Sequence, residues 1–329
     1  MTSQRRSLVA AVAALLSLPG VAFTQSARHY RLGILSIDDN PRDSIWLAFL
    51  TELARLGYVE GQNVTMVPSF VDPGRHTFES AATELVNSKV DLIYVVAGTA
   101  GVRAAMKATA TTPIVMLTSS DPVRDGLVAS LRRPGGNVTD NAIFGPELLA
   151  KRLQIIVELT GKPRQVALLT TTDASRSRNP EAFQKSLAAA AQAVGTEAKV
   201  FQLNTMDELE PVLADIANQR LALVVDTTSL FYVHVRRLGA LVTQYRLPAV
   251  GDGRRYAEAG FLVAYGLDYH DLARKSARCI ARIFDGANAG DLPVELANKF
   301  EMIVNLKAAA ALGLTVPRGM LAGATEIIR

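Results

Sequence analysis

The sequence predicts an α/β fold of two doubly wound parallel-sheet lobes joined by crossovers. Short continuous apolar runs, such as residues 91–96, alternate with longer amphipathic stretches. This alternation is typical of parallel strands that are covered by helices on both faces. The series then restarts near 140–145 with elements of similar size, and 329 residues are enough for two domains of ordinary size.

The first lobe begins with an expected strand over 31–37. A helix follows, capped by Asp43 or Ser44 and ended by Gly57. Its apolar residues recur on one helical face: Ile45, Phe49, Leu53 and Leu56. The other elements expected in this lobe are a strand over 63–70, a helix through 78–86, a strand over 91–96, a helix over 99–108 and a strand over 113–117.

The second series opens with a helix that starts at Gly145-Pro146, and Asn179-Pro180 caps a later helix. Strands are expected over 165–170, 199–203, 221–226 and 248–251. The ending adds a strand over 261–265, a helix over 269–285 that Asp268 caps, and a strand over 300–306. These elements are too few for a third domain. We therefore expect them to complete the two sheets, so that the chain crosses between the lobes more than once.

Residues 1–26 have the pattern of a secretory signal peptide. Arg5 and Arg6 precede an apolar run over 8–16, and the helix-breaking Pro19-Gly20 leads into small residues. The run is too short for a membrane span, and no cysteine is nearby to carry a lipoprotein anchor. We expect a cleaved signal peptide and a periplasmic protein. The pattern leaves open the cleavage site and the choice between the Sec and twin-arginine routes.

The predicted domains are the signal peptide 1–26, a first lobe of 27–141 plus about 266–300, and a second lobe of 142–265 plus about 301–329. The formal charge is +4, and no cluster of Lys and Arg is interleaved with aromatic residues. We therefore expect no nucleic-acid partner. Cys279 is the single cysteine, and its helical spacing from Ser276 and Ile280 indicates a buried structural thiol.

Polar and small residues follow the predicted strands, where parallel sheets bind ligands. These segments are 36–39, 97–100 and 118–121 in the first lobe, and 170–174, 226–229 and 251–254 in the second. They are rich in Gly, Ser, Thr and Asp, which supply hydroxyls and accessible backbone N–H groups. At helix N-termini such groups stabilise anions.

Enzyme signatures are missing from the sequence. It contains no Gly-x-Ser-x-Gly elbow and no phosphate loop that ends in Gly-Lys-Ser/Thr. Gly251-Asp252-Gly253 lacks the third glycine of a dinucleotide fingerprint, and the four histidines are scattered without metal-ligand spacing. We therefore expect no catalytic residues, no metal and no cofactor. Two lobes, a signal peptide and polar strand ends favour the capture of a solute over its chemical conversion.

Several short motifs carry a resemblance to a known family. Three of them follow one another: Asp121-Pro122-Val123, Gly126-Leu127-Val128 and the run over 133–139. We expect residues 121–140 to close a strand, to cover the core and then to turn at Pro134-Gly135-Gly136 into the first crossover. Further motifs lie over 56–64, 259–268, 291–295, 299–301 and 305–314. In this order, along nearly the whole mature chain, they resemble the periplasmic substrate-binding proteins of ABC transporters, and within them the tryptophan/aromatic amino-acid branch.

The resemblance implies a type I periplasmic-binding fold with three interlobe crossovers and closure around a small ligand. It places Gly98, Thr99 and Ala100 where a first-lobe helix start receives a ligand carboxylate, although Thr99 can equally be the cap of that helix. The other residues that the family pattern or a strand end places in the cleft are Ser36, Ser119, Ser120, Asp121, Asp173, Thr227, Thr228, Gly253 and Arg254.

The sequence departs from the family pattern on the cleft walls. Members often carry Asn-Pro where this chain has Thr171-Thr172-Asp173, and Pro-Asp-Pro where it has Asp226-Thr227-Thr228. The resemblance therefore leaves the ligand open.

We expect a monomeric, non-enzymatic solute-binding subunit of an ABC import system that captures a small carboxylate-bearing solute, such as an amino acid, and docks on a membrane permease. One alternative is a sensory module that presents its solute to a membrane receptor or kinase, and another is a secreted enzyme on the same fold.

Overall fold

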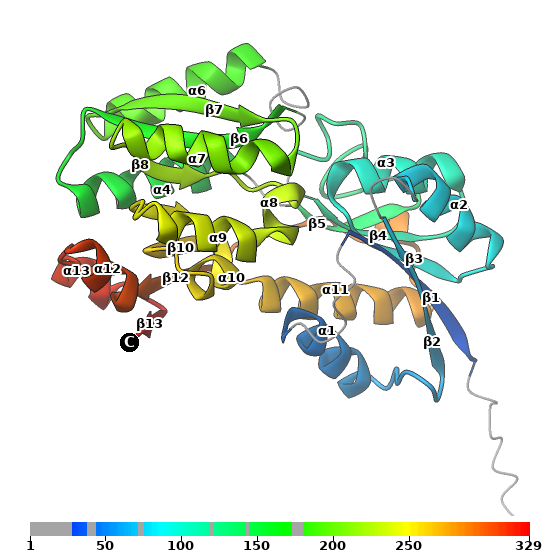
Figure 1. Cartoon of the computed structure of the whole chain (residues 1–329). Helices are drawn as coiled ribbons and strands as arrows, with labels where there is room; N and C mark the ends of the chain where they lie inside the picture. The colour runs from blue at the N-terminus through cyan, green and yellow to red at the C-terminus, as the bar shows by residue number, and fades with distance from the viewer. Residues whose placement is uncertain (1–27, 38–43, 72–75, 119–120, 143–144, 173–179) are drawn as a thin grey trace, which may run out of the picture.

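A computed structural model describes residues 28–37, 44–71, 76–118, 121–142, 145–172 and 180–329. The protein has two α/β lobes, each built around its own sheet (Figure 1). The predicted fold class is confirmed. The predicted signal peptide, 1–26, lies outside the described residues, and within them no helix is long and apolar enough to cross a membrane.

The first sheet is parallel throughout. In spatial order its strands are β11 (Glu295–Leu296), β5 (Val138–Ala142), β4 (Ile114–Thr118), β3 (Leu92–Val96), β1 (Tyr30–Ser36) and β2 (Val64–Phe70). Its helices are α1 (Ser44–Arg55), α2 (Phe78–Asn87), α3 (Gly98–Ala108) and α11 (Tyr269–Phe284).

Alternate residues of the first-sheet strands face opposite helices. Leu32 and Ile34 of β1 pack with α1 and α11, whereas Leu35 of the same strand packs with α2 and α3. This follows from the two-residue period of a strand, and it explains why the strands are apolar without interruption.

The second sheet is parallel except that β12 runs antiparallel to β10. In spatial order its strands are β13 (Glu326–Ile328), β12 (Phe300–Asn305), β10 (Val263–Leu267), β9 (Ala249–Gly251), β8 (Ala222–Val225), β6 (Gln165–Thr171) and β7 (Glu197–Leu203). Its helices are α4 (Gly145–Thr160), α6 (Pro180–Ala193), α7 (Leu209–Asn218), α8 (Ser229–Val233), α9 (Val235–Gln244), α10 (Gly253–Glu258), α12 (Leu306–Leu312) and α13 (Arg318–Ala322).

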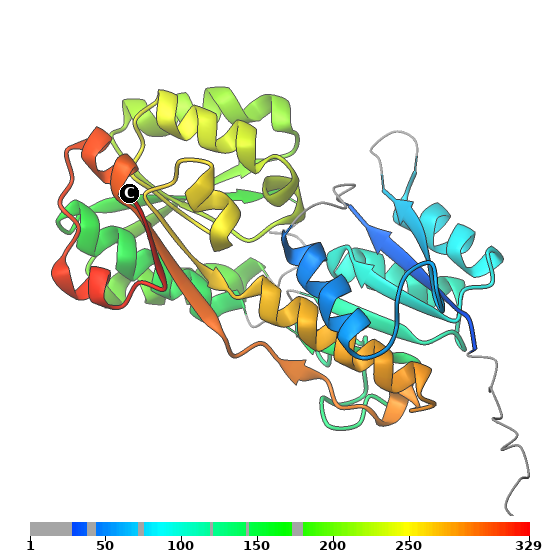
Figure 2. The ribbon, with the colours of Figure 1, turned by 90° about the horizontal axis from the view of Figure 1, so that it is seen from below.

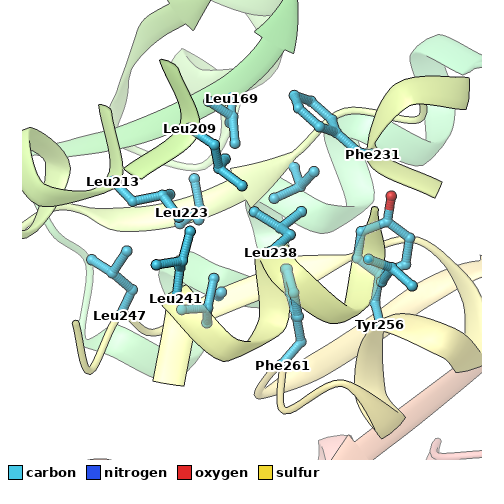
Figure 3. Packing of buried hydrophobic residues seen from close by; sticks show 14 of the residues in the cluster. Leu169, Leu209, Leu213, Leu223, Phe231, Leu238, Leu241, Leu247, Tyr256 and Phe261 are labelled. Carbon is cyan, nitrogen blue, oxygen red and sulfur yellow. The ribbon is translucent and has the colours of Figure 1, made fainter. Parts of the chain in front are cut away.

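The second lobe also has a hydrophobic core on each face of its sheet. On one face, leucines of α7 and α9 pack over β6 and β8 (Figure 3). On the other face, α4 and α6 cover the opposite side chains of the same strands. Each lobe is thus doubly wound, as the sequence predicted.

Counted between the described elements, the chain passes from one lobe to the other at three places: between β5 and α4, between β10 and α11, and between β11 and β12 (Figure 2). Two of these crossovers are bonded together, because Asp268 N donates to Lys299 O at 3.0 Å. The sheets take up residues 30–142 with 295–296, and 165–267 with 300–328. The lobe boundaries at 141/142 and near 266 and 300 stay a prediction.

The segment before the first crossover differs from expectation. The chain bends at residues 136–137, just after Gly135 N donates to Gly290 O at 3.0 Å, but this segment leads into strand β5 and not directly into the crossover. The sequence did not indicate this strand because its central residues are polar. Thr139 nevertheless lies fully buried and donates to Leu292 O at 2.7 Å, so that its hydroxyl is satisfied inside the core.

Candidate functional site

The first-lobe candidates lie where β1, β3 and β4 end. Ser36 is the last residue of β1 and is buried. Gly98, with φ 63°, begins α3, and Thr99 and Ala100 form the first turn of that helix. The N-cap position belongs to Ala97, which makes no side-chain cap. The alternative that Thr99 caps the helix is therefore wrong, since Thr99 lies inside the first turn.

Asp121 is engaged in the turn that follows β4. Its Oδ1 accepts hydrogen bonds from the backbone N–H groups of Val123 at 3.0 Å and Arg124 at 3.1 Å. Ser119, Ser120 and, in the second lobe, Asp173 lie outside the described residues.

The second-lobe candidates lie at the ends of β8 and β9. Thr228 is the N-cap of α8 and accepts from Phe231 N at 3.3 Å. Gly253, with φ 57°, begins α10, and the backbone N–H of Arg254 donates to Glu301 at 3.2 Å. The Arg254 guanidinium pairs with Glu326 of β13. The Arg254 side chain is thus paired with a residue of its own lobe.

Arg152 is a residue of this site that sequence reasoning missed. It belongs to α4, its side chain is 1% exposed, and it donates from Nη1 to Thr227 Oγ1 at 2.9 Å. It also donates from Nη2 to Asp252 Oδ1 at 2.6 Å and from Nε to Tyr265 O at 2.7 Å. The signal was present in the sequence, because an i, i+4 spacing sets Arg152 in the apolar stripe between Leu148 and Ile156. A charged residue in such a stripe requires partners.

Asp252, at the end of β9, is held on both carboxylate oxygens. Oδ1 accepts from Arg152, and Oδ2 accepts from the Tyr269 hydroxyl at 2.7 Å. A Cβ on Gly266 would come within 2.1 Å of Asp252 Oδ1, so only glycine leaves room for this carboxylate. Burial, followed by the charge of Asp252, raises the pKa of Tyr269 well above its usual value, so its hydroxyl stays a donor.

A cavity of about 370 Å³ lies between the lobes beside this network. Residues of α1 form its first-lobe side, and residues of α8, α9 and α10 form its second-lobe side. Its lining includes basic, acidic and aromatic side chains: Arg236, Arg254, Arg255, His270, Asp252, Glu258, Glu301, Tyr232 and Tyr269. Burial is the main cause that raises the pKa of Glu301. The volume is within the range of small-ligand sites.

Two of the predicted cleft residues, Gly253 and Arg254, line this cavity, and Thr227 is joined to it through Arg152. The Arg255 guanidinium lies 4.4 Å from the centroid of the Tyr232 ring, a cation–π distance. Charges of both signs beside aromatic rings suit a zwitterion with an apolar or aromatic side chain. Among the described residues, no group of three or more His, Cys, Asp or Glu side chains could hold a metal ion.

Comparison with known families gives one match over most of the chain. The profile of the family described as "ABC transporter substrate binding protein" matches residues 34–328. A curated relative, the tyrosine-binding protein of Clostridioides difficile (strain R20291), is 26% identical over 292 residues, which cover 88% of this chain and 83% of the relative.

Solved structures show the same fold. The ABC domain of a Streptococcus pneumonia protein in complex with L-Trp has a TM-score of 0.79 and 23% identity, covering 91% of this chain and 100% of that one. A substrate-binding protein with adhesive properties from Clostridium difficile, in its ligand-free, open form, has a TM-score of 0.64 and 24% identity, covering 91% and 99%.

Proposed function

Because the chain belongs to the family of ABC transporter substrate-binding proteins, we propose that it captures an aromatic amino acid between its lobes and delivers it to its permease. The observation that carries the proposal is the interlobe cavity, where Tyr232 and Tyr269 lie among charges of both signs. Similar proteins bind tyrosine or were solved with L-Trp, and this supports the choice of ligand class.

The chemistry of the cavity is suited to such a ligand. A free amino acid brings a carboxylate, an ammonium group and a side chain that must each find a partner when water is excluded. In the first lobe, outside the residues that line the cavity, we place the carboxylate at the first turn of α3, at Gly98 and Thr99. The rings of Tyr232 and Tyr269, whose centroids are 6.2 Å apart, offer an aromatic surface to the side chain.

We also propose that the protein is a periplasmic monomer without enzymatic activity or nucleic-acid partner. The signal-peptide pattern of residues 1–26, the lack of a basic and aromatic cluster, and the lack of catalytic motifs in the sequence support this. The polar residues of the described cleft support it too, because Asp121, Thr228 and Asp252 are engaged in turns, caps and an ion pair.

Thermal-shift and calorimetric titrations of the mature protein test the ligand class. We expect L-Trp, L-Tyr or L-Phe to raise the melting temperature, with about 2.7 kcal/mol of added stability at 100 times the Kd. L-Ala, L-Leu and D-glucose should have far smaller effects. Stabilisation by the sugar alone, with none by the aromatic amino acids, would contradict the proposal.

A pair of variants adds a test of the site. Tyr232→Leu removes a ring from the cavity and should weaken the binding of the aromatic probe. Tyr245→Leu makes the same change in the same lobe, at a residue whose hydroxyl lies 3.4 Å from Glu210 outside the cavity. It should leave the affinity unchanged. Equal affinities of the two variants would remove Tyr232 from the ligand site.

A further inference from the structure

Tyr269 links the two lobes through its side chain. It is the first residue of α11, and the body of this helix packs on the first lobe, where Ala273, Ala277 and Ile280 contact the core shared by β1 and α1. Its hydroxyl, however, bonds to Asp252 in the second lobe. Its ring also covers Gly253, since a Cβ at that glycine would lie 3.2 Å from the ring. A rotation of α11 relative to the second sheet therefore acts directly on Asp252.

Asp252 cannot move together with Tyr269 without disturbing its ion pair with Arg152. Its ion pair with Arg152 has both side chains almost fully excluded from water, at 3% and 1% exposure. Separating two such buried charges leaves each one unpaired in a medium of low polarity, which is far more costly than breaking a surface pair. The carboxylate and the guanidinium are thus expected to move as one unit.

Arg152 extends this unit to the other cleft wall of the second lobe. Besides Asp252, its guanidinium bonds to Thr227 Oγ1, at the end of β8, and to Tyr265 O, in β10. One side chain therefore joins the carboxyl ends of β8 and β9 to the strand that leads into the crossover. The planar fork of arginine makes this possible, because its five donors point in fixed directions.

We propose that Arg152 and Tyr269 are positioning residues for the bound solute: together they hold Asp252, Arg152 also holds the cleft segment 227–228, and Tyr269 also holds the segment 253–254. Helix α11, which follows the second crossover, sets the geometry of this group. The position of the lobes and the geometry of the ligand walls are then coupled. Because coupling is reciprocal, a solute that orders these walls also favours one position of α11. The effect on a bound solute rests on the proposed function, whereas the coupling itself does not.

The first test is hydrogen exchange of the ligand-free mature protein carrying Tyr269→Phe. The variant keeps the ring and loses only the hydroxyl. We expect backbone amides over 226–228 and 252–254 to exchange about 3–10-fold faster, as the loss of one buried hydrogen bond implies.

Tyr58→Phe is the matched control. The Tyr58 hydroxyl bonds to Asp285, the C-cap of the same helix α11, at 2.5 Å, but this contact lies inside the first lobe. It should leave exchange at 226–228 and 252–254 unchanged. Equal effects of the two variants on these amides, or none for Tyr269→Phe, would overturn the proposal.

A double-variant cycle tests the route through Arg152. Arg152→Lys keeps the buried positive charge but lacks the fork that spans Asp252 and Thr227. In this background we expect Tyr269→Phe to have little further effect at 227–228, since the connection is already broken. If the full effect at 227–228 persists in the Arg152→Lys background, the signal does not pass through Arg152 and the network is wrong.

Calorimetry with L-Trp as the probe adds the functional readout. Tyr269→Phe should bind L-Trp about 3–10-fold more weakly than Tyr58→Phe, although both variants lose one tyrosine–carboxylate bond. Equal affinities would overturn the positioning role. Failure of the unmutated protein to bind any of L-Trp, L-Tyr and L-Phe would instead contradict the proposed function, and the ligand-free exchange experiment would still decide on the coupling.

Discussion

The Ser276 hydroxyl of α11 donates a hydrogen bond to the Asp140 carboxylate of β5, and both side chains are buried inside the first lobe. Asn141 Nδ2 donates to the other oxygen of this carboxylate at 2.6 Å. Burial, only partly offset by these hydrogen bonds, raises the pKa of Asp140 to about 8. Nearby Glu295 raises it further and Lys275 lowers it.

This carboxyl predicts an unusual dependence of stability on pH. Its pKa is higher in the folded state than in the unfolded state, so the folded protein binds the extra proton between about pH 4 and pH 8. The contribution of Asp140 to stability should therefore be fully present at low pH and should be lost as the pH rises through about 8. Urea unfolding of the mature protein at pH 5 to 9 measures it.

Asp140→Asn isolates the effect. Asparagine, like aspartate, is enriched at positive φ among residues other than glycine, which suits the φ of 104° at this position, and its amide has no proton to lose. We expect the variant to gain stability relative to the unmutated protein as the pH rises from 5 to 9. Asp91→Asn, at a partly exposed carboxylate that pairs with Arg28, should show no such gain. A stability difference between Asp140→Asn and the unmutated protein that stays constant over this range would contradict the prediction.

The sequence predicted the apolar elements well and the polar interior poorly. Strand β3 is a continuous apolar run and helix α11 has a strong helical period, and the structure has both within one or two residues of expectation. Strand β5 was missed, because Thr139, Asp140 and Asn141 look like a loop until their partners in α11 and at Leu292 are known. Those partners are more than 130 positions away, and no local pattern indicates them.

The same reason explains the site. Gly253 and Arg254 were found because strand ends can be read from the sequence, and they line the interlobe cavity. Arg152 was missed because it lies in the middle of a helix, and its role depends on Asp252, 100 residues away. Cys279 was expected to be a buried thiol. It is partly buried among residues of α1 and α11, and burial raises the pKa of its thiol.

Asp268→Ala should lower stability without a large loss of binding. The Asp268 side chain caps α11 by accepting from Asp271 N at 2.9 Å, as the sequence predicted. Losing this cap should cost about 0.5–2 kcal/mol of unfolding free energy. Asp268→Asn keeps a capping oxygen and should lose much less. Chemical unfolding measures both variants, and a stable alanine variant that no longer binds its solute would show that Asp268 contacts the ligand.

Binding should change the overall shape of the protein. Three crossovers connect the lobes, and a ligand that contacts both lobes stabilises the state in which it makes the most contacts. We expect small-angle scattering to give a smaller radius of gyration with a saturating aromatic amino acid than without it. D-Glucose at the same concentration is the control. An unchanged radius at saturation would mean that capture involves no closure.

The anion end of the site gives the last prediction. Thr99 lies in the first turn of α3. The N-cap residue of this helix, Ala97, makes no side-chain hydrogen bond to the turn, and the helix dipole adds partial positive charge there. A solute carboxylate held at this turn accepts hydrogen bonds from the backbone N–H groups of the turn and from the Thr99 hydroxyl. Thr99→Val removes the hydroxyl at nearly constant volume and should weaken binding by about 1–3 kcal/mol, whereas Thr99→Ser should retain most of the affinity. Calorimetry with L-Trp and its methyl ester completes the test, because the ester has lost the charge and should bind poorly even to the unmutated protein. Equal affinity for the acid and the ester would show that the carboxylate does not bind at this turn. The solute would then have a different orientation in the cleft.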